Sequence, residues 1–187
     1  MIYEFCAENV TLLEKAMEAG ARRIELCDNL AVGGTTPSYG VTKAAVELAA
    51  NYDTTIMTMI RPRGGDFVYN DLEIAIMLED IRLTAQAGSQ GVVFGALTAD
   101  KKLDKANLEK LIAASKGMEI VFHMAFDELG DEDQLEAIDW LSQAGVTRIL
   151  TRAGVSGDSL EKRFNHYHRI LEHASGKIEI LPGGGID

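Results

Sequence analysis

One stretch of the sequence decides the fold: Thr55-Ile56-Met57-Thr58-Met59-Ile60-Arg61-Pro62-Arg63-Gly64-Gly65-Asp66-Phe67. Its first six residues are mostly apolar and predict a buried strand. The rest is typical of a loop, because proline stiffens the backbone and two glycines allow a tight turn or a close approach to a ligand. An amphipathic segment follows at once, so the stretch is a strand-to-helix unit.

The same unit recurs along the chain at roughly 25–30 residues per repeat, the length of a strand plus a crossover helix. We expect strands at 2–6, 23–27, 55–60, 91–95, 119–123, 148–151 and 177–181. We expect helices at 8–19, 41–50, 71–87, 103–114, 131–144 and 159–174.

This alternation implies parallel strands, in either a closed (β/α)₈ barrel or an open doubly wound sheet. We favour an α/β fold of the TIM (β/α)₈ type, because no turn carries a dinucleotide fingerprint and polar residues recur at strand ends. No linker divides residues 1–187, so we expect a single domain. Only seven strands are visible, so we expect a chain truncated after strand seven, or an incomplete barrel whose edges a partner or swapped segment covers.

Composition excludes several classes of function. The chain has 187 residues and a net charge of −11, which argues against nonspecific binding to nucleic acid or to an anionic membrane. It has no apolar run of about 18 residues that could span a membrane. Two cysteines and no recognisable export signal predict free thiols in the cytoplasm.

The alternation of side chains along a strand predicts which residues face the barrel interior. Glu4 and Cys6 share one face of the first strand, and Glu25 and Cys27 share one face of the second. Their apolar neighbours should meet the helices, so these four side chains should point inward. By the same alternation His123 points inward from the fifth strand.

The two cysteines then end neighbouring strands at the rim of the barrel. Neighbouring strands lie about 4.8 Å apart, so two thiolates could hold a soft monovalent ion such as Cu(I) in near-linear geometry. A disulfide fits the distance but not the compartment. The remaining alternative is that both cysteines are small buried fillers.

Arg61 and Arg63 carry forked donors suited to a carboxylate or phosphate, unless Asp66 merely pairs with one of them to brace the loop. Glu4, Glu25, Arg61 and His123 should converge inside the mouth. They are candidates for acid–base catalysis and anion binding, or for a buried polar network that only fills the centre.

A glycine run follows the last strand. In (β/α)₈ barrels the loops at this place often bind phosphate through backbone N–H groups. Gly183, Gly184 and Gly185 are therefore candidate anion-binding residues.

At these residues the sequence resembles the CutC-type copper homeostasis family. The matching stretches run in order from one end of the chain to the other: Glu4–Cys6, Arg23–Cys27, Gly33–Gly40, Ile60–Phe67, Val93–Gly95, Phe122–Asp127 and Pro182–Gly185.

The resemblance implies a cytoplasmic TIM-barrel protein that handles copper, with Cu(I) proposed at Cys6 and Cys27, and a dimer or higher oligomer. The family usually has arginine where Met124 stands, and Ser-Gly where this chain has Arg152-Ala153. Loss of a cation at position 124 puts anion binding near His123 in doubt, and Arg152 is placed to restore positive charge. Family members also continue through an eighth strand.

Three functions stay open at this point. The first is copper homeostasis through Cu(I) binding at Cys6 and Cys27. The alternative is a barrel enzyme acting on a small anionic, possibly phosphorylated, metabolite, with His123, Glu25 or Glu4 as the catalytic groups. The third is a structural barrel whose polar centre only stabilises it.

Overall fold

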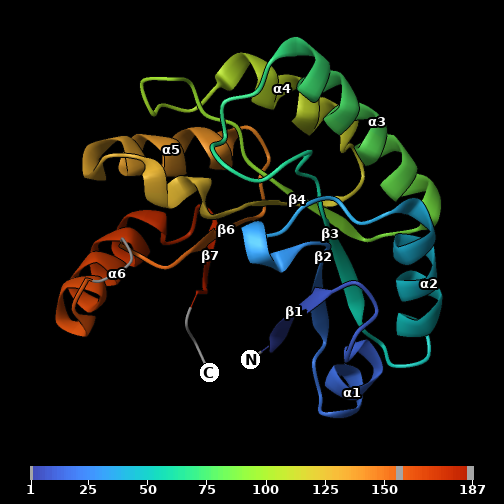
Figure 1. Cartoon of the computed structure of the whole chain (residues 1–187). Helices are drawn as coiled ribbons and strands as arrows, with labels where there is room; N and C mark the ends of the chain where they lie inside the picture. Colours follow the sequence, from blue (N-terminus) through green and yellow to red (C-terminus); the bar gives the residue numbers. More distant parts are fainter. Residues whose placement is uncertain (1, 155–157, 185–187) are drawn as a thin grey trace.

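The computed structural model describes residues 2–154 and 158–184, and there seven strands curl into part of a barrel with helices outside it (Figure 1). The strands are β1 (Glu4–Glu8), β2 (Arg23–Cys27), β3 (Thr55–Met59), β4 (Gly91–Phe94), β5 (Glu119–Phe122), β6 (Arg148–Thr151) and β7 (Glu179–Pro182). The helices are α1 (Leu13–Glu18), α2 (Tyr39–Ala49), α3 (Asp71–Ala87), α4 (Lys105–Ala114), α5 (Asp131–Gln143) and α6 (Leu160–Ala174), with short 3-10 helices η1 (Leu30–Val32) and η2 (Met124–Glu128).

The strands lie in chain order, and each pairs in parallel with the next. The predicted TIM-type α/β architecture is therefore confirmed. β1 and β7 are the two outer strands of the described sheet. No helix within the described ranges is long and apolar enough to cross a membrane.

Alternate strand residues enter different apolar clusters on the two faces of the sheet, as the period of two predicts. Ile24, Leu26 and Ile56 pack outward with Leu13 of α1 and Ala45 of α2. The inward-facing residues form a smaller cluster inside the barrel: Cys27, Met57, Met59, Val93, Val121 and the partly buried Leu150. Cys27 therefore lies in the barrel interior.

The first helix is shorter than predicted. β1 continues to Glu8, whose carboxylate accepts a hydrogen bond from the backbone N–H of Leu30 at 2.7 Å, and α1 starts only at Leu13. Asn9 and Leu12 between them have φ of 57° and 58°, in the left-handed region that an α-helix excludes. The prediction of a helix from residue 8 was wrong at its start for this reason.

The strand ends were also predicted slightly long. β3 ends at Met59, β4 at Phe94 and β5 at Phe122, so His123 lies just beyond its strand and is the N-cap of η2. Gly183 and Gly184 follow β7, and Gly185 lies outside the described residues.

The loop after β3 is tied to the helix that follows it. Asn70 caps α3 by accepting from the backbone N–H of Glu73 at 3.0 Å, and Glu73 accepts from the Asn70 N–H at 2.9 Å. The other Glu73 oxygen accepts from Arg63 Nε at 2.5 Å. This capping box fixes where the arginine-bearing loop ends.

Candidate metal and polar site at the barrel mouth

Two thiols and one carboxylate meet between β1 and β2. Cys6 Sγ, Cys27 Sγ and a Glu25 carboxylate oxygen all lie within 4.8 Å of one another. The register explains this, because Cys6 pairs directly with Glu25 across the strands, and Cys27 is two residues further along the same face. Cys27 and Glu25 are buried, whereas Cys6, on the outer strand, is exposed.

The three groups perturb one another's protonation. A hydrogen bond from Cys27 is the main cause that lowers the pKa of Cys6 to about 7. The pKa of Cys27 is raised, chiefly by that same bond and then by burial. Burial also raises the pKa of Glu25, and the neighbouring Cys6 adds to it. Cys6 is therefore the thiol of the pair that ionises first, through neutral pH, and Cys27 stays the thiol that donates to it.

We expect a thiol-reactive dye to label the two cysteines of the native protein at very different rates. Cys6 is exposed and its pKa is near 7, so its labelling rate should rise through pH 7 as the thiolate forms. Cys27 is only 1% exposed and should react at least about 100-fold more slowly, through local opening. Stopped-flow absorbance measures both rates. The Cys6→Ser variant should keep only the slow phase, and equal rates for both thiols would contradict the assignment.

Glu4 is not a member of this group, although its charge acts on Cys6 and Glu25. It begins β1, opposite Arg23, whose Nη1 donates to its carboxylate at 3.4 Å. Arg148 and Glu119, at the starts of β6 and β5, also act on its charge. Glu4 shares the inward face of Cys6 but does not lie at the mouth. It is two positions earlier in β1 than Cys6, so its side chain lies one layer nearer the amino ends of the strands.

The donors of Arg61 are directed at the protein itself. Its Nη1 donates to the carbonyls of Val32 and Gly34, both at 2.9 Å, and its Nη2 to the carbonyl of Gly65 at 2.7 Å. Gly34 in turn packs against Cys27, since a Cβ there would lie 3.1 Å from Cys27 Sγ. Arg61 thus holds the loop that covers the buried thiol.

Arg63 is engaged in the same way. It donates to Glu73, to the Asp66 carboxylate at 3.0 Å and to the carbonyl of Val68 at 2.8 Å. The bracing role weighed for Asp66 is thus present in the geometry. Anion binding by Arg63 stays a prediction that would require these bonds to be exchanged. Anion binding by Arg61 also stays a prediction, but its Nε has no partner in the described structure.

His123 is buried at the end of β5 with a defined tautomer. Its Nδ1 accepts from the backbone N–H of Ala125 at 3.2 Å, so Nε2 carries the ring proton. Burial, with the nearby charge of Arg61, lowers the pKa of His123 to about 3. Its ring lies against Phe67, with centroids 4.8 Å apart. His123 is therefore a neutral hydrogen-bond donor in the folded protein.

Arg152 contacts Met124, the residue that stands where the family usually has arginine. Its Nη2 lies 3.5 Å from the Met124 sulfur, and its Nε would lie 3.4 Å from a Cβ on Gly184. Its backbone N–H donates to Asp127, whose carboxylate also accepts from the Thr151 hydroxyl. Asp127 had no predicted role, although it stands in the quoted Phe122–Asp127 stretch.

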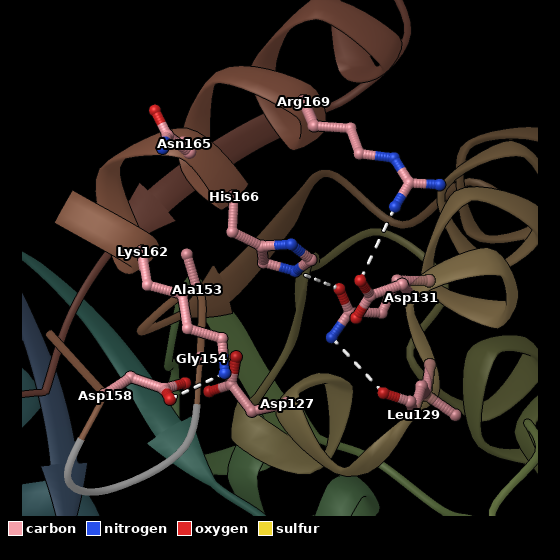
Figure 2. Close-up of a pocket in the computed structure, with 11 residues that line it drawn as sticks. Asp127, Leu129, Asp131, Ala153, Gly154, Asp158, Lys162, Asn165, His166 and Arg169 are labelled. Atoms are coloured by element: carbon pink, nitrogen blue, oxygen red, sulfur yellow. Dashed lines mark hydrogen bonds and ion pairs between the residues drawn. The ribbon is translucent and has the colours of Figure 1, made fainter.

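A pocket of about 380 Å³ lies elsewhere, between α5 and α6 (Figure 2). In its wall His166 Nε2 pairs with the Gln134 amide oxygen at 2.7 Å, and Gln134 donates to the Phe126 carbonyl at 3.0 Å. Arg169 pairs with Asp131 across the same seam. These groups satisfy one another, so we assign no chemistry to this pocket.

Comparison with known proteins agrees with this architecture. The family model for the CutC family matches residues 1–187. A CutC protein of Enterococcus faecalis is 52% identical over 186 residues, covering 100% of this chain and 89% of that protein. The chain belongs to the CutC family. A human copper homeostasis protein of this family is 41% identical and matches 99% of this chain and 65% of its own length.

Solved structures give the same result for the fold. A CutC structure from Streptococcus agalactiae superposes with a TM-score of 0.95 at 46% identity, covering 100% of this chain and 89% of that one. A deoxyribose phosphate aldolase from Aeropyrum pernix superposes with a TM-score of 0.70 at 15% identity, covering 99% of this chain and 76% of that one. The second likeness shows the fold alone.

Proposed function

We propose that this CutC-family chain serves copper homeostasis in the cytoplasm by binding Cu(I) at Cys6 and Cys27. The observation that carries the proposal is the meeting of the chain's only two thiols at the mouth of the barrel. The family's copper homeostasis label gives the ion. The cytoplasm, where thiols stay reduced, would keep both ligands available.

The donor set fits a soft ion. Thiolates select Cu(I), whereas a carboxylate such as Glu25 suits harder ions, so the two sulfurs would be the ligands. Cys27 would hold the ion from the buried side, and exposed Cys6 would be the point of entry and exchange. The expected dimer or higher oligomer is not needed for this site and stays a prediction.

We expect the reduced protein to bind one Cu(I), with affinity lowered at least about 100-fold in the Cys6→Ser/Cys27→Ser variant. The reason is that loss of outer-shell partners alone typically costs 10–100-fold, and here both ligands are removed. Titration against a competing Cu(I) chelator measures the affinity.

The matched control is Met57→Leu, which removes a sulfur from the same interior cluster but keeps its apolar volume. Its affinity should stay close to that of the parent protein. Unchanged Cu(I) affinity in the double cysteine variant would rule the proposal out.

A second candidate function is an enzyme acting on a small anionic metabolite. Three polar atoms near the carboxyl ends of β2, β3 and β5 are buried and unpaired in the described structure: Glu25 Oε1, Arg61 Nε and His123 Nε2. Unpaired buried polar atoms are uncommon and call for an explanation such as catalysis or an absent ligand. Their place is where (β/α)₈ barrels carry their active sites.

A further inference from the structure

The ring of Phe67 covers two buried hydrogen-bond donors. The Arg61 Cζ lies 4.9 Å from the ring centroid, and the imidazole centroid of His123 lies 4.8 Å from it. Both side chains are more than nine-tenths buried, at 4% and 3% exposed. Arg61 Nε and His123 Nε2 find no acceptor among residues 2–154 and 158–184.

Both atoms carry a hydrogen. A guanidinium is always protonated in proteins. In His123 the bond from the Ala125 N–H to Nδ1 places the ring proton on Nε2. Three hydrogens on Nη1 and Nη2 of Arg61 donate to backbone carbonyls, and Nε is the nitrogen of this side chain that has no partner in the described structure.

Space filling alone explains the pair poorly. A buried donor without an acceptor destabilises the folded state, and two such side chains lie beside one ring. Contact of a guanidinium with an aromatic face recovers only part of that free energy. An anionic oxygen lying against both side chains would supply the acceptor that each donor lacks, and charge-assisted bonds of this kind are the strong ones.

We propose that Arg61 Nε–H and His123 Nε2–H together bind a carboxylate or phosphoryl oxygen of a small ligand, and that the Phe67 ring takes the place of this oxygen in the free protein. The inference rests on the second candidate function, in which the mouth receives an anionic metabolite, and it does not involve the cysteines.

The loop is built so that the ring can move while the donors stay. Arg63 bonds to Asp66 and to the Val68 carbonyl, on either side of Phe67, which fixes the backbone there. Phe67 itself is only partly buried, so rotation of one side chain would open the place to the mouth. Arg61 and His123 are held independently by backbone contacts.

This assignment changes the part played by His123. The sequence suggested a general acid or base, but a ring that stays neutral and donates through Nε2 is suited to stabilising charge on a ligand oxygen. Preorganised donors of this kind stabilise negative charge that develops during a reaction. Proton transfer would then fall to another group, and Glu25 is the candidate carboxylate.

The test removes the ring and offers a small oxyanion. In metal-free Phe67→Ala protein, kept in chelator, formate is titrated while ¹H–¹⁵N NMR follows the His123 side chain. We expect saturable formate binding at least about ten-fold tighter than in the parent protein, with a shift of the Nε2–H resonance. The Phe67→Ala/His123→Asn variant should lose at least about ten-fold of that affinity, because it keeps an acceptor for Ala125 but lacks the Nε2 donor.

Benzene serves as the contrasting probe, because a dry cavity left by a phenyl ring binds it. The proposal would be overturned if Phe67→Ala bound benzene but not formate. It would also be overturned if adding His123→Asn left the formate affinity unchanged. If thermal melting shows that Phe67→Ala does not fold, Phe67→Leu is read in the same way. If formate binds as expected but no small anionic metabolite binds the parent protein, the donor pair stands and the second candidate function fails.

Discussion

Replacing Arg61 by methionine is expected to lower the free energy of unfolding by about 3 kcal/mol. The substitution removes three hydrogen bonds from a charged group to the carbonyls of Val32, Gly34 and Gly65. Each such bond is worth about 1.5–3 kcal/mol, and the gain from no longer burying a charge offsets part of the sum. Urea unfolding followed by circular dichroism measures the change.

Arg63→Met is the matched control, two residues further along the same loop. Its side chain is 38% exposed, whereas Arg61 is buried, so solvent screens its bonds to Glu73, to Asp66 and to the Val68 carbonyl more than those of Arg61. We expect a loss of about 1 kcal/mol or less. Equal losses at the two positions would mean that Arg61 does not brace the loop as its contacts indicate.

Much of the fold follows from the sequence because the hydrophobic periodicity and the turn residues between segments indicate the same elements along the chain. Apolar runs and amphipathic segments alternate, and the parallel pairing follows from that alternation. The chain order of the strands followed from a second argument, the lack of a dinucleotide fingerprint and the polar residues at strand ends. The start of the first helix could not be predicted, because its spacing is helical. Left-handed conformations at Asn9 and Leu12, with Glu8 held by the N–H of Leu30, exclude a helix there.

The candidate site could be predicted only in part. Strand alternation placed Glu25 and Cys27 inward, and pairing of neighbouring strands brought Cys6 to them. Alternation gives the face of a strand but not the height along the barrel. Glu4 therefore shares the face of Cys6 and yet lies one layer away, beside Arg23.

The hydrogen-bond partners of buried side chains cannot be read from the sequence either. The sequence does not distinguish an arginine that donates to three backbone carbonyls from one that is free to bind an anion. The contacts of Arg61 could therefore be assigned only from the folded loop. For the same reason the sequence could not assign the tautomer of His123, which is set by a single backbone N–H. Phe67 is part of the loop quoted from the sequence, but only the fold shows that its ring lies against Arg61 and His123.

His123 is expected to make stability fall with acidification. The ring has a pKa of about 3 when folded and near 6.5 when unfolded, so the folded state favours the neutral form. This contribution is fully present above pH 6.5 and is lost as the pH falls toward 3. At about 1.36 kcal/mol per pH unit, going from pH 7 to pH 4.5 removes about 2.7 kcal/mol.

The comparison with His123→Asn isolates this contribution, because asparagine does not titrate and its side-chain oxygen can still accept from Ala125. Other groups move stability too: burial raises the pKa of Glu25 and of Asp127, so their contributions run the opposite way with pH. The difference in unfolding free energy between parent and variant should therefore shrink by about 2–3 kcal/mol between pH 7 and pH 4.5. The same substitution at His168, which is exposed on α6, is the control for replacing a histidine by asparagine outside the barrel mouth. An NMR titration that finds His123 protonating near pH 6.5 in the folded protein would contradict both this stability difference and the neutral donor on which the Arg61–His123 pair depends.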